Sequence, residues 1–306
     1  MPIVFEGATI SGGISIEPYI PPAGSKAIFG YGSTGSATAI TNLVSNTGVV
    51  ATDTTGVGTA RTELAAAGYG SDKAIFGYGD TGSVTSITNL VSNTGVVATN
   101  TTGVGTARSG LAAAVYGTDK AIFGYGFDGV TGTVSLTNKV SNTGVVASDT
   151  TGVGTARSGL AAAGYGSDKA IFGYGSGGAG ATSVTNLVSN TGVVGNDVTG
   201  VGTARYAVTA ATYGTDKAIF GYGATTAITN LVSNTGVVAT DTAGVGTARY
   251  YLAAAGYSTD KAIFGYGIGP GGAKSMTNLV SNTGIVATDT TGVGTARYYL
   301  AAASYG

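Results

Sequence analysis

The sequence predicts an all-β protein, and more specifically a six-bladed β-propeller made of four-stranded antiparallel blades. Three observations lead to this prediction. The 306-residue chain repeats one unit six times. Each unit contains short apolar runs rich in Val, Ile, Tyr and Thr, and Gly, Asn, Asp or Ser residues bound these runs, as is typical of strands. Units of 44 to 49 residues with four such runs are typical of propeller blades.

Two sequence markers define the repeat. The first, Lys-Ala-Ile-Phe-Gly-Tyr-Gly, begins at Lys26, Lys73, Lys120, Lys169, Lys217 and Lys261. The second, Gly-Val-Gly-Thr-Ala-Arg, ends at Arg61, Arg108, Arg157, Arg205, Arg249 and Arg297. Because every unit carries both markers, we expect the units to share one structure.

The second unit shows where the four strands are expected. They cover residues 64–69, 74–78, 87–91 and 96–100. Residues 70–73 join the first pair of strands and residues 92–95 join the second pair, and both turns contain residues that tolerate a positive φ. Small residues dominate the first strand of each unit, because the innermost strands of a propeller crowd around its axis.

The two ends of the chain are expected to complete one blade together. The last predicted strand, residues 300–305, is an innermost strand whose partners would be the first strands after Lys26. Such closure hides the sheet edges that otherwise promote aggregation. An open β-solenoid is the alternative, but its coils are usually shorter and its terminal repeats differ from the rest. The predicted division is therefore an N-terminal docking arm, residues 1–24, and a propeller, residues 25–306.

The composition argues against an enzyme. The chain contains no Cys, His or Trp, and only 9% of its residues are charged, with a net charge of −1. Without His it lacks the commonest general base and the commonest transition-metal ligand. We therefore expect no catalytic residues, no cofactor and no metal. Without a basic face we expect no nucleic-acid binding.

Segments for targeting or membrane insertion are not expected either. No run of about 18 apolar residues is long enough to span a bilayer. The first 24 residues lack the basic and apolar regions of a secretory signal. The expectation is therefore synthesis in the cytoplasm without membrane insertion.

An acidic or amide residue stands eight positions before each repeated Arg. These residues are Asp53, Asn100, Asp149, Asp197, Asp241 and Asp289. An ionic pairing would leave Arg108 uncompensated, because Asn replaces Asp in that unit. The pattern therefore favours a structural role in which the side chain accepts a hydrogen bond from backbone.

Differences between the units are expected on one face, which we call the variable face. They fall in the loop between the second and third strands and in the two residues after each Arg. The aromatic residues there are Phe127, Tyr206, Tyr250, Tyr251, Tyr298 and Tyr299. Two interpretations of the tyrosines stay open: a binding surface with hydroxyl groups, or side chains that fill gaps between blades.

Three acidic residues break the symmetry on the same face. They are Glu63, Asp80 and Asp128. Such carboxylates can bind Ca²⁺ or act as an acid/base pair. With no His and no further acidic cluster nearby, they are interpreted as part of a partner-binding surface rather than a catalytic site.

One part of the repeat resembles a known family. Residues 107–114 read Ala-Arg-Ser-Gly-Leu-Ala-Ala-Ala, and residues 121–126 read Ala-Ile-Phe-Gly-Tyr-Gly. This arrangement is similar to a kelch repeat, in which an Arg and a small-residue strand precede an apolar strand that ends in a glycine pair. Here a Tyr separates the glycines, and the kelch Trp is missing. The resemblance, over residues 26–306, implies propeller blades and leaves an intracellular protein-interaction module as a third functional hypothesis.

The leader suggests where the protein works. It alternates apolar residues, Ile3, Phe5, Ile10, Ile14 and Ile16, before a Pro-rich end. Its Gly-Gly-Ile-Ser-Ile segment resembles N-terminal segments of some tailed-phage structural proteins. That resemblance implies a virion or extracellular surface component that docks onto other structural proteins through residues 1–24 and displays its propeller to a host or neighbouring protein. The alternative is a lectin that binds a glycan or host-surface receptor with its tyrosines.

Overall fold

The computed structural model describes residues 26–306, and the predicted docking arm, including Ile3, Phe5, Ile10, Ile14 and Ile16, lies outside the described residues. Within residues 26–306 the chain is all-β and contains no helix, which confirms the all-β part of the prediction. Its strands form small antiparallel sheets, each of three strands apart from two short hairpins. The repeated units are consistent with a β-propeller.

Each repeat contributes the same three strands in the same order. In the described part of the chain the three-stranded sheets are β3 (Ala65–Tyr69), β4 (Lys73–Gly77) and β5 (Thr88–Val91); β6 (Ala112–Tyr116), β7 (Lys120–Gly124) and β8 (Thr137–Val140); β9 (Ala161–Tyr165), β10 (Lys169–Gly173) and β13 (Thr185–Val188); β14 (Thr209–Tyr213), β15 (Lys217–Gly221) and β16 (Thr229–Val232); β17 (Ala253–Tyr257), β18 (Lys261–Gly265) and β21 (Thr277–Val280); and β1 (Lys26–Gly30), β2 (Thr41–Val44) and β22 (Ala301–Tyr305).

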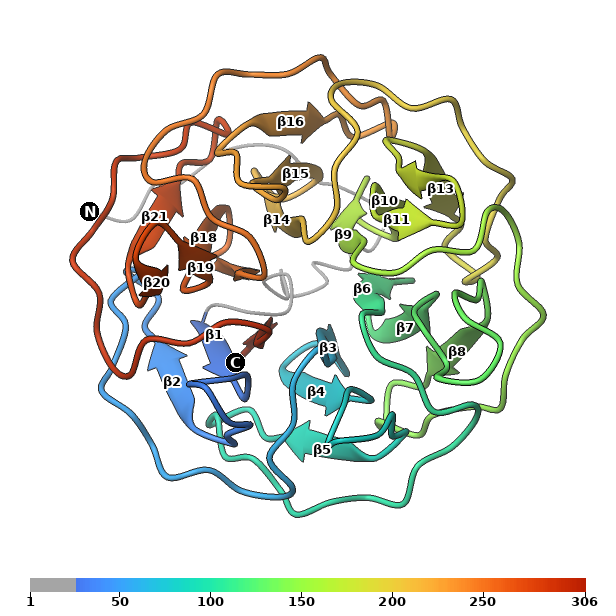
Figure 1. Ribbon diagram of the computed structural model, residues 1–306, viewed down its shortest axis with the longest axis horizontal. Coiled ribbons are helices and arrows are strands. Elements are labelled where there is room, and N and C mark those ends of the chain that lie inside the picture. The colour runs from blue at the N-terminus through green and yellow to red at the C-terminus, as the bar shows by residue number, and fades with distance from the viewer. Residues whose placement is uncertain (1–25) are drawn as a thin grey trace, which may run out of the picture.

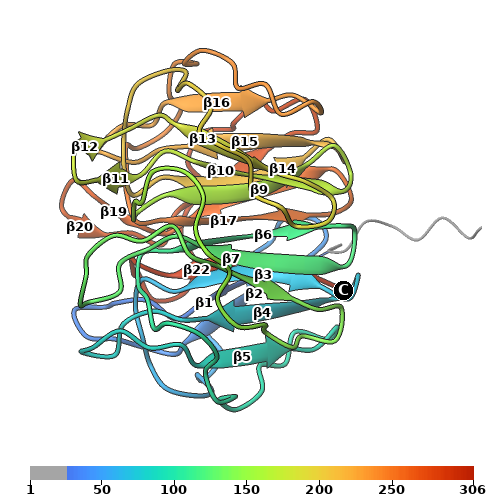
Figure 2. The same cartoon turned by 90° about the vertical axis from the view of Figure 1, so that its right-hand side faces the viewer.

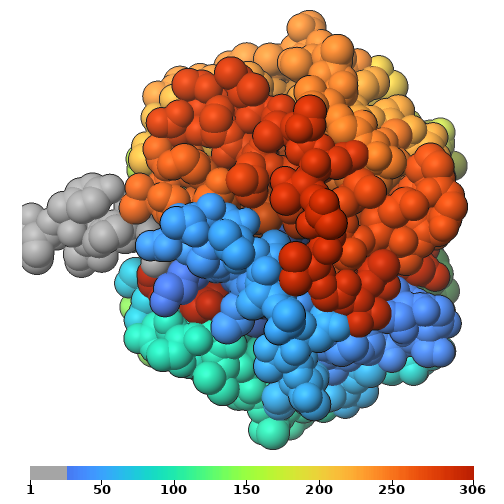
Figure 3. All heavy atoms as spheres, turned by 90° about the vertical axis from the view of Figure 1, so that its left-hand side faces the viewer, coloured from blue at the N-terminus to red at the C-terminus, as the bar shows by residue number. Residues whose placement is uncertain are grey.

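The sheets lie side by side around a common centre, with β3, β6, β9 and β14 among the strands nearest to it (Figure 1). Each of these innermost strands contacts the innermost strands of both neighbouring sheets. The last strand, β22, pairs with the first, β1, from Lys26 opposite Tyr305 to Gly30 opposite Ala301. The N-terminal and C-terminal segments of the described chain therefore share one sheet, and their surfaces adjoin in Figure 3.

The prediction of four strands per unit was wrong in its fourth strand. In the second unit the expected segment, residues 96–100, makes only isolated bridges to β5, Val91 with Val97 and Thr88 with Thr101. The outer segment has one residue more than β5 between these bridges, so a regular ladder cannot form. The Asn89 side chain fills the gap and donates a hydrogen bond to the Ala98 carbonyl at 3.0 Å. The other three strands agree with the prediction to within one residue.

The hydrophobic core lies between neighbouring sheets. One cluster joins Ile75 and Tyr78 of one sheet to Leu111 and Phe123 of the next. A glycine makes this contact close, because a Cβ on Gly77 would stand 2.7 Å from the Phe123 ring. Since each sheet buries its faces only against its neighbours, the units stabilise one another in sequence around the centre.

The variable face lies opposite the face that carries the turns between the first and second strands of each unit, such as residues 70–73, which we call the hairpin-turn face. The two short hairpins, β11 (Ser176–Gly177) with β12 (Gly180–Ala181) and β19 (Ile268–Gly269) with β20 (Gly272–Ala273), project from the variable face (Figure 2). In five units a bridge such as Thr62 with Asp80 joins the residue after the Arg to the loop between the second and third strands. In the sixth unit a hydrogen bond from Ala224 N–H to the Tyr206 carbonyl makes this connection. Both kinds of sequence variation therefore meet on the variable face.

Candidate binding site

A ring of backbone hydrogen bonds lies at the centre of the variable face. It joins the residues two positions after each Arg, which we call the axial ring: Glu63, Gly110, Gly159, Ala207, Tyr251 and Tyr299. The N–H of each donates to the carbonyl of the one before it, and the N–H of Glu63 donates to the carbonyl of Tyr299, over 2.8 to 3.3 Å. All of them have a left-handed backbone, with φ between 53° and 60°. Because only backbone atoms bond, the ring leaves its side chains free to differ.

A cavity of about 310 Å³ opens above the axial ring. The residues that follow the ring form its apolar floor: Leu64, Leu111, Leu160, Val208, Leu252 and Leu300. Four aromatic side chains, Phe127, Tyr206, Tyr251 and Tyr299, also line it, together with Glu63. Of the residues predicted from the sequence, those that line this axial cavity are Glu63, Phe127, Tyr206, Tyr251 and Tyr299, and those that do not are Asp80, Asp128, Tyr250 and Tyr298.

Tyrosines cover one side of the cavity. The rings of Tyr250 and Tyr251 have centroids 5.0 Å apart, those of Tyr251 and Tyr299 are 3.9 Å apart, and those of Tyr299 and Tyr298 are 5.0 Å apart. Tyr250 and Tyr298 thus flank the stack without lining the cavity. On the opposite side of the axial ring stand Gly110 and Gly159, which have no side chains and therefore leave the space that forms the cavity.

Glu63 places a carboxyl group in this cavity. Burial raises its pKa above the usual value, a hydrogen bond with Ser109 opposes that shift, and the negative charge of Asp80 adds to it. No Lys or Arg among residues 26–306 forms an ion pair with Glu63. Burial, together with the negative charge of Glu63, also raises the pKa of Tyr251 and Tyr299, so both phenols stay protonated at neutral pH.

The other two acidic residues stabilise their own loops. The Asp80 carboxylate accepts a hydrogen bond from Gly82 N–H at 2.6 Å. Asp128 accepts hydrogen bonds from the Thr131 hydroxyl and from the backbone N–H groups of Val130, Thr131 and Gly132, and these lower its pKa to about 2. Neither residue lines the axial cavity. Across residues 26–306, no three acidic side chains come together as a metal centre would require.

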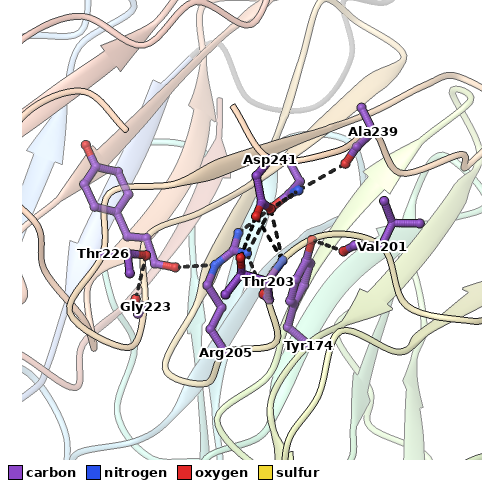
Figure 4. Close-up of polar contacts among 10 residues, drawn as sticks. Tyr174, Val201, Thr203, Arg205, Gly223, Thr226, Ala239 and Asp241 are labelled. Carbon is purple, nitrogen blue, oxygen red and sulfur yellow. Dashed lines mark hydrogen bonds and ion pairs between the residues drawn. The ribbon is translucent and has the colours of Figure 1, made fainter. Parts of the chain in front are cut away.

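The repeated Arg residues belong to a different set of contacts, which we call the inter-sheet layer (Figure 4). Arg205 is fully buried and donates to the Tyr222 carbonyl at 2.9 Å, the Thr203 carbonyl at 3.0 Å and Asn230 Oδ1 at 2.6 Å. Its guanidinium also lies 4.4 Å from the centre of the Tyr174 ring in the preceding sheet. Each Arg therefore links two sheets.

The acidic residues of this layer accept hydrogen bonds from backbone, as the sequence indicated, but across the repeat boundary. Asp241 accepts from the N–H and the hydroxyl of Thr203, at 3.0 and 2.6 Å, and from Asn230 Nδ2 at 2.9 Å. Burial works to raise the pKa of Asp241, but these hydrogen bonds and the nearby Arg205 outweigh it and lower the pKa. The ion pairs of this layer therefore join an Arg to the Asp of the following repeat, not to the one eight positions earlier, as between Arg205 and Asp241. Four of the Arg residues form such a pair, namely Arg108, Arg205, Arg249 and Arg297.

Sequence reasoning missed two features. The first is the buried Asn in the third strand of each unit, such as Asn230. The sequence feature that could have revealed it is an Asn at the same position of that strand in all six units. The second is the axial ring, which has almost no signal because it is made by backbone.

A second cavity of about 870 Å³ lies between the innermost strands. Small residues such as Ala113 and Ala162 line it, and it reaches the turns of the hairpin-turn face at Ser71 and Ser167.

The described residues contain no helix long and apolar enough to cross a membrane.

Comparison with protein-family models finds none that matches the chain, and comparison with curated proteins finds no similar sequence.

Proposed function

We propose that the protein is a non-enzymatic structural and binding protein, in which a closed six-bladed β-propeller displays its variable face to a partner. The axial ring, which returns from Tyr299 to Glu63, and the pairing of β22 with β1 support closure. We further propose that the protein is a virion or surface component anchored to other structural proteins through residues 1–24, as the leader suggests. The kelch-like and phage-like resemblances are part of the same proposal.

One observation carries the binding role: apart from the Nε atoms of Arg108 and Arg249, the buried polar side chains of the inter-sheet layer are paired within the fold, whereas the fold does not require Glu63 and the tyrosines above the axial ring. The ring positions in other units are Gly and Ala, which make the same backbone contacts. Side chains that the scaffold does not need, gathered in a cavity, are candidates for recognition.

Deletion of residues 1–22 tests the anchoring role. The truncated chain should stay folded, because the sheets of residues 26–306 pair and pack with one another, but it should no longer be incorporated into particles assembled with the other structural proteins. Incorporation is measured by quantifying the chain in purified particles. Normal incorporation of the truncated chain would contradict the proposal.

A second candidate function, glycan binding, is favoured by the stacked tyrosines. Phenol rings beside a carboxyl group suit the apolar face and hydroxyl groups of a sugar. The intact protein should then bind members of an arrayed glycan library, and Tyr299→Ala should lose that signal. Lys217→Ala, on the hairpin-turn face, is the control for this variant. Another tyrosine such as Tyr257 would not serve, because it is buried in the core. A blank array for the intact protein removes this candidate.

A further inference from the structure

The axial ring contains one acidic side chain, Glu63, and it forms no ion pair within residues 26–306. Of the positions in the ring, only Glu63 has a carboxyl group, and Gly, Ala or Tyr take the same left-handed backbone elsewhere. A carboxylate withdrawn from water without a counter-charge is destabilising. Asp80 nearby increases the negative potential around it. The cavity is thus electrostatically complementary to a cation.

The side chains that line the cavity indicate which kind of cation it would bind. Aromatic side chains stand on more than one side, with Tyr251 and Tyr299 beside Glu63 and with Phe127 and Tyr206 also on the lining. Aromatic faces attract alkylated ammonium groups within about 6 Å of the ring centre. The Leu and Val floor suits the alkyl part of such an ion and offers nothing to a strongly hydrated one.

Other ligand classes fit less well. A divalent metal ion needs about six oxygen ligands, whereas only Glu63 contributes a carboxylate to the lining and Asp80 is bound to Gly82. An anion would be repelled by Glu63. A neutral sugar could use the tyrosines, but it would gain nothing from the charge.

We infer that the axial cavity binds an alkylated ammonium ion, with the Glu63 carboxylate as the counter-charge and the tyrosines as its aromatic walls. The inference deepens the proposed binding function and rests on it. Free choline and the choline head group of a lipid share this chemistry.

Isothermal titration of the full chain with choline chloride tests the inference. The matched ligand is 3,3-dimethylbutan-1-ol, which has the same shape without the charge. Choline should bind at least about tenfold more tightly, since one charge pair and one aromatic contact are together worth that factor. Equal binding of the two ligands, or no heat with choline up to millimolar concentration, would overturn the inference.

Two variants assign the binding to this cavity. Glu63→Gln should weaken choline about tenfold and leave the neutral ligand unchanged. Gly159→Tyr should abolish binding of both, because the new ring fills the cavity. The fold should accept it, since Gly159 has φ 60° and the tyrosines at 251 and 299 have φ 53° and 57°. Unchanged choline binding in either variant would place the ion elsewhere and overturn the inference.

If Gly159→Tyr does not fold, Glu63→Gln still decides the test, because that variant removes the charge and keeps the shape of the cavity.

Vesicles of phosphatidylcholine distinguish the two sources of the ligand. Binding to vesicles but not to free choline assigns a lipid head group, and the reverse assigns the free ion. Competition by Ca²⁺ at Glu63 in place of choline would make the cavity a metal site and overturn the inference. A glycan signal that Gly159→Tyr removes, with no choline binding, would leave the proposed function standing and refute the ammonium ligand alone.

Discussion

The inter-sheet layer and the axial ring both repeat around the molecule, but side chains make the contacts of the first and backbone atoms make those of the second. The inter-sheet layer keeps Arg, Tyr and Asn in every unit, because those side chains make the contacts. The axial ring joins Glu, Gly, Ala and Tyr, because its contacts are made by backbone. Where backbone supplies the bonds, the sequence can vary, and the variation can be used for recognition.

The largest expected difference is at a buried guanidinium. Arg157→Met removes the donors to the Tyr174 carbonyl, the Thr155 carbonyl and Asn186 Oδ1, which Arg157 reaches at 2.8, 2.9 and 2.6 Å. Unpaired buried acceptors should lower the free energy of unfolding by about 3–5 kcal/mol, measured by urea denaturation.

Two controls sharpen this prediction. Lys217→Met, in an exposed pair with Asp216, should cost at most about 1 kcal/mol. Arg249→Met should cost about 1 kcal/mol less than Arg157→Met, because the buried Nε of Arg249 has no hydrogen-bond partner. Equal losses for Arg157 and Lys217 would contradict the assignment of the layer as the link between sheets.

The next effect concerns the close approach of neighbouring sheets. Gly124→Ala puts a Cβ 2.7 Å from the end of the Phe172 ring, so the two sheets must separate or the ring must move. Overpacking of this kind should cost about 1–3 kcal/mol. Gly178→Ala, where an added Cβ meets nothing within 4 Å, is the matched control and should be close to neutral in the same denaturation experiment.

A smaller effect is expected when a tyrosine is removed from the axial ring. Tyr299→Ala loses ring contacts with Tyr251 and Tyr298 but keeps the backbone bonds, so the loss should be about 1 kcal/mol. Tyr125→Ala, in the inter-sheet layer, removes a fully buried ring and its hydroxyl bond to the Val153 carbonyl, and should cost about 3–5 kcal/mol. Similar melting temperatures for the two variants would erase the distinction between the regions.

Much of the fold could be predicted from the sequence because its signals are local and repeated. The strand containing Ala-Ile-Phe, the turns rich in Gly and Asn, and the pairing of residues 301–305 with the first strand all follow from residue type and order. The fourth strand could not be predicted correctly, because its extra residue is evident only from its pairing with β5, where the Asn89 side chain fills the gap in the ladder.

The candidate site was predicted less completely. The aromatic residues of the variable face included Tyr251 and Tyr299, but only the fold places these two in the cavity, with Tyr250 and Tyr298 beside them. Asp128 and Glu63 look alike in the sequence. They differ because Asp128 is bound by its own loop, whereas Glu63 stands on the axial ring and faces a cavity left by distant glycines.

The smallest expected effect is at the unit in which the layer departs from its own pattern. Asn100 accepts from Thr59 N–H at 3.1 Å and donates to the Thr59 hydroxyl at 2.6 Å, so it reproduces the contacts of Asp in the other units but leaves Arg61 without a carboxylate. Asn100→Asp should add that charge and stabilise the fold by at most about 1 kcal/mol, because the equivalent carboxylates are partly exposed.

The pH dependence of that gain tests its cause. The pKa of the equivalent Asp149 is lowered, since hydrogen bonds from Thr106 and Asn138 and the charge of Arg108 outweigh burial, which works to raise it. A group with a lowered pKa in the folded state stabilises the fold above its unfolded pKa of about 3.9 and loses that contribution as the pH falls through the folded pKa. The stabilisation by Asn100→Asp should therefore be present at neutral pH and vanish in acid, and Asp149→Asn should show the mirror-image loss. A gain that is the same at both pH values would show that packing, not charge, distinguishes this unit from the others.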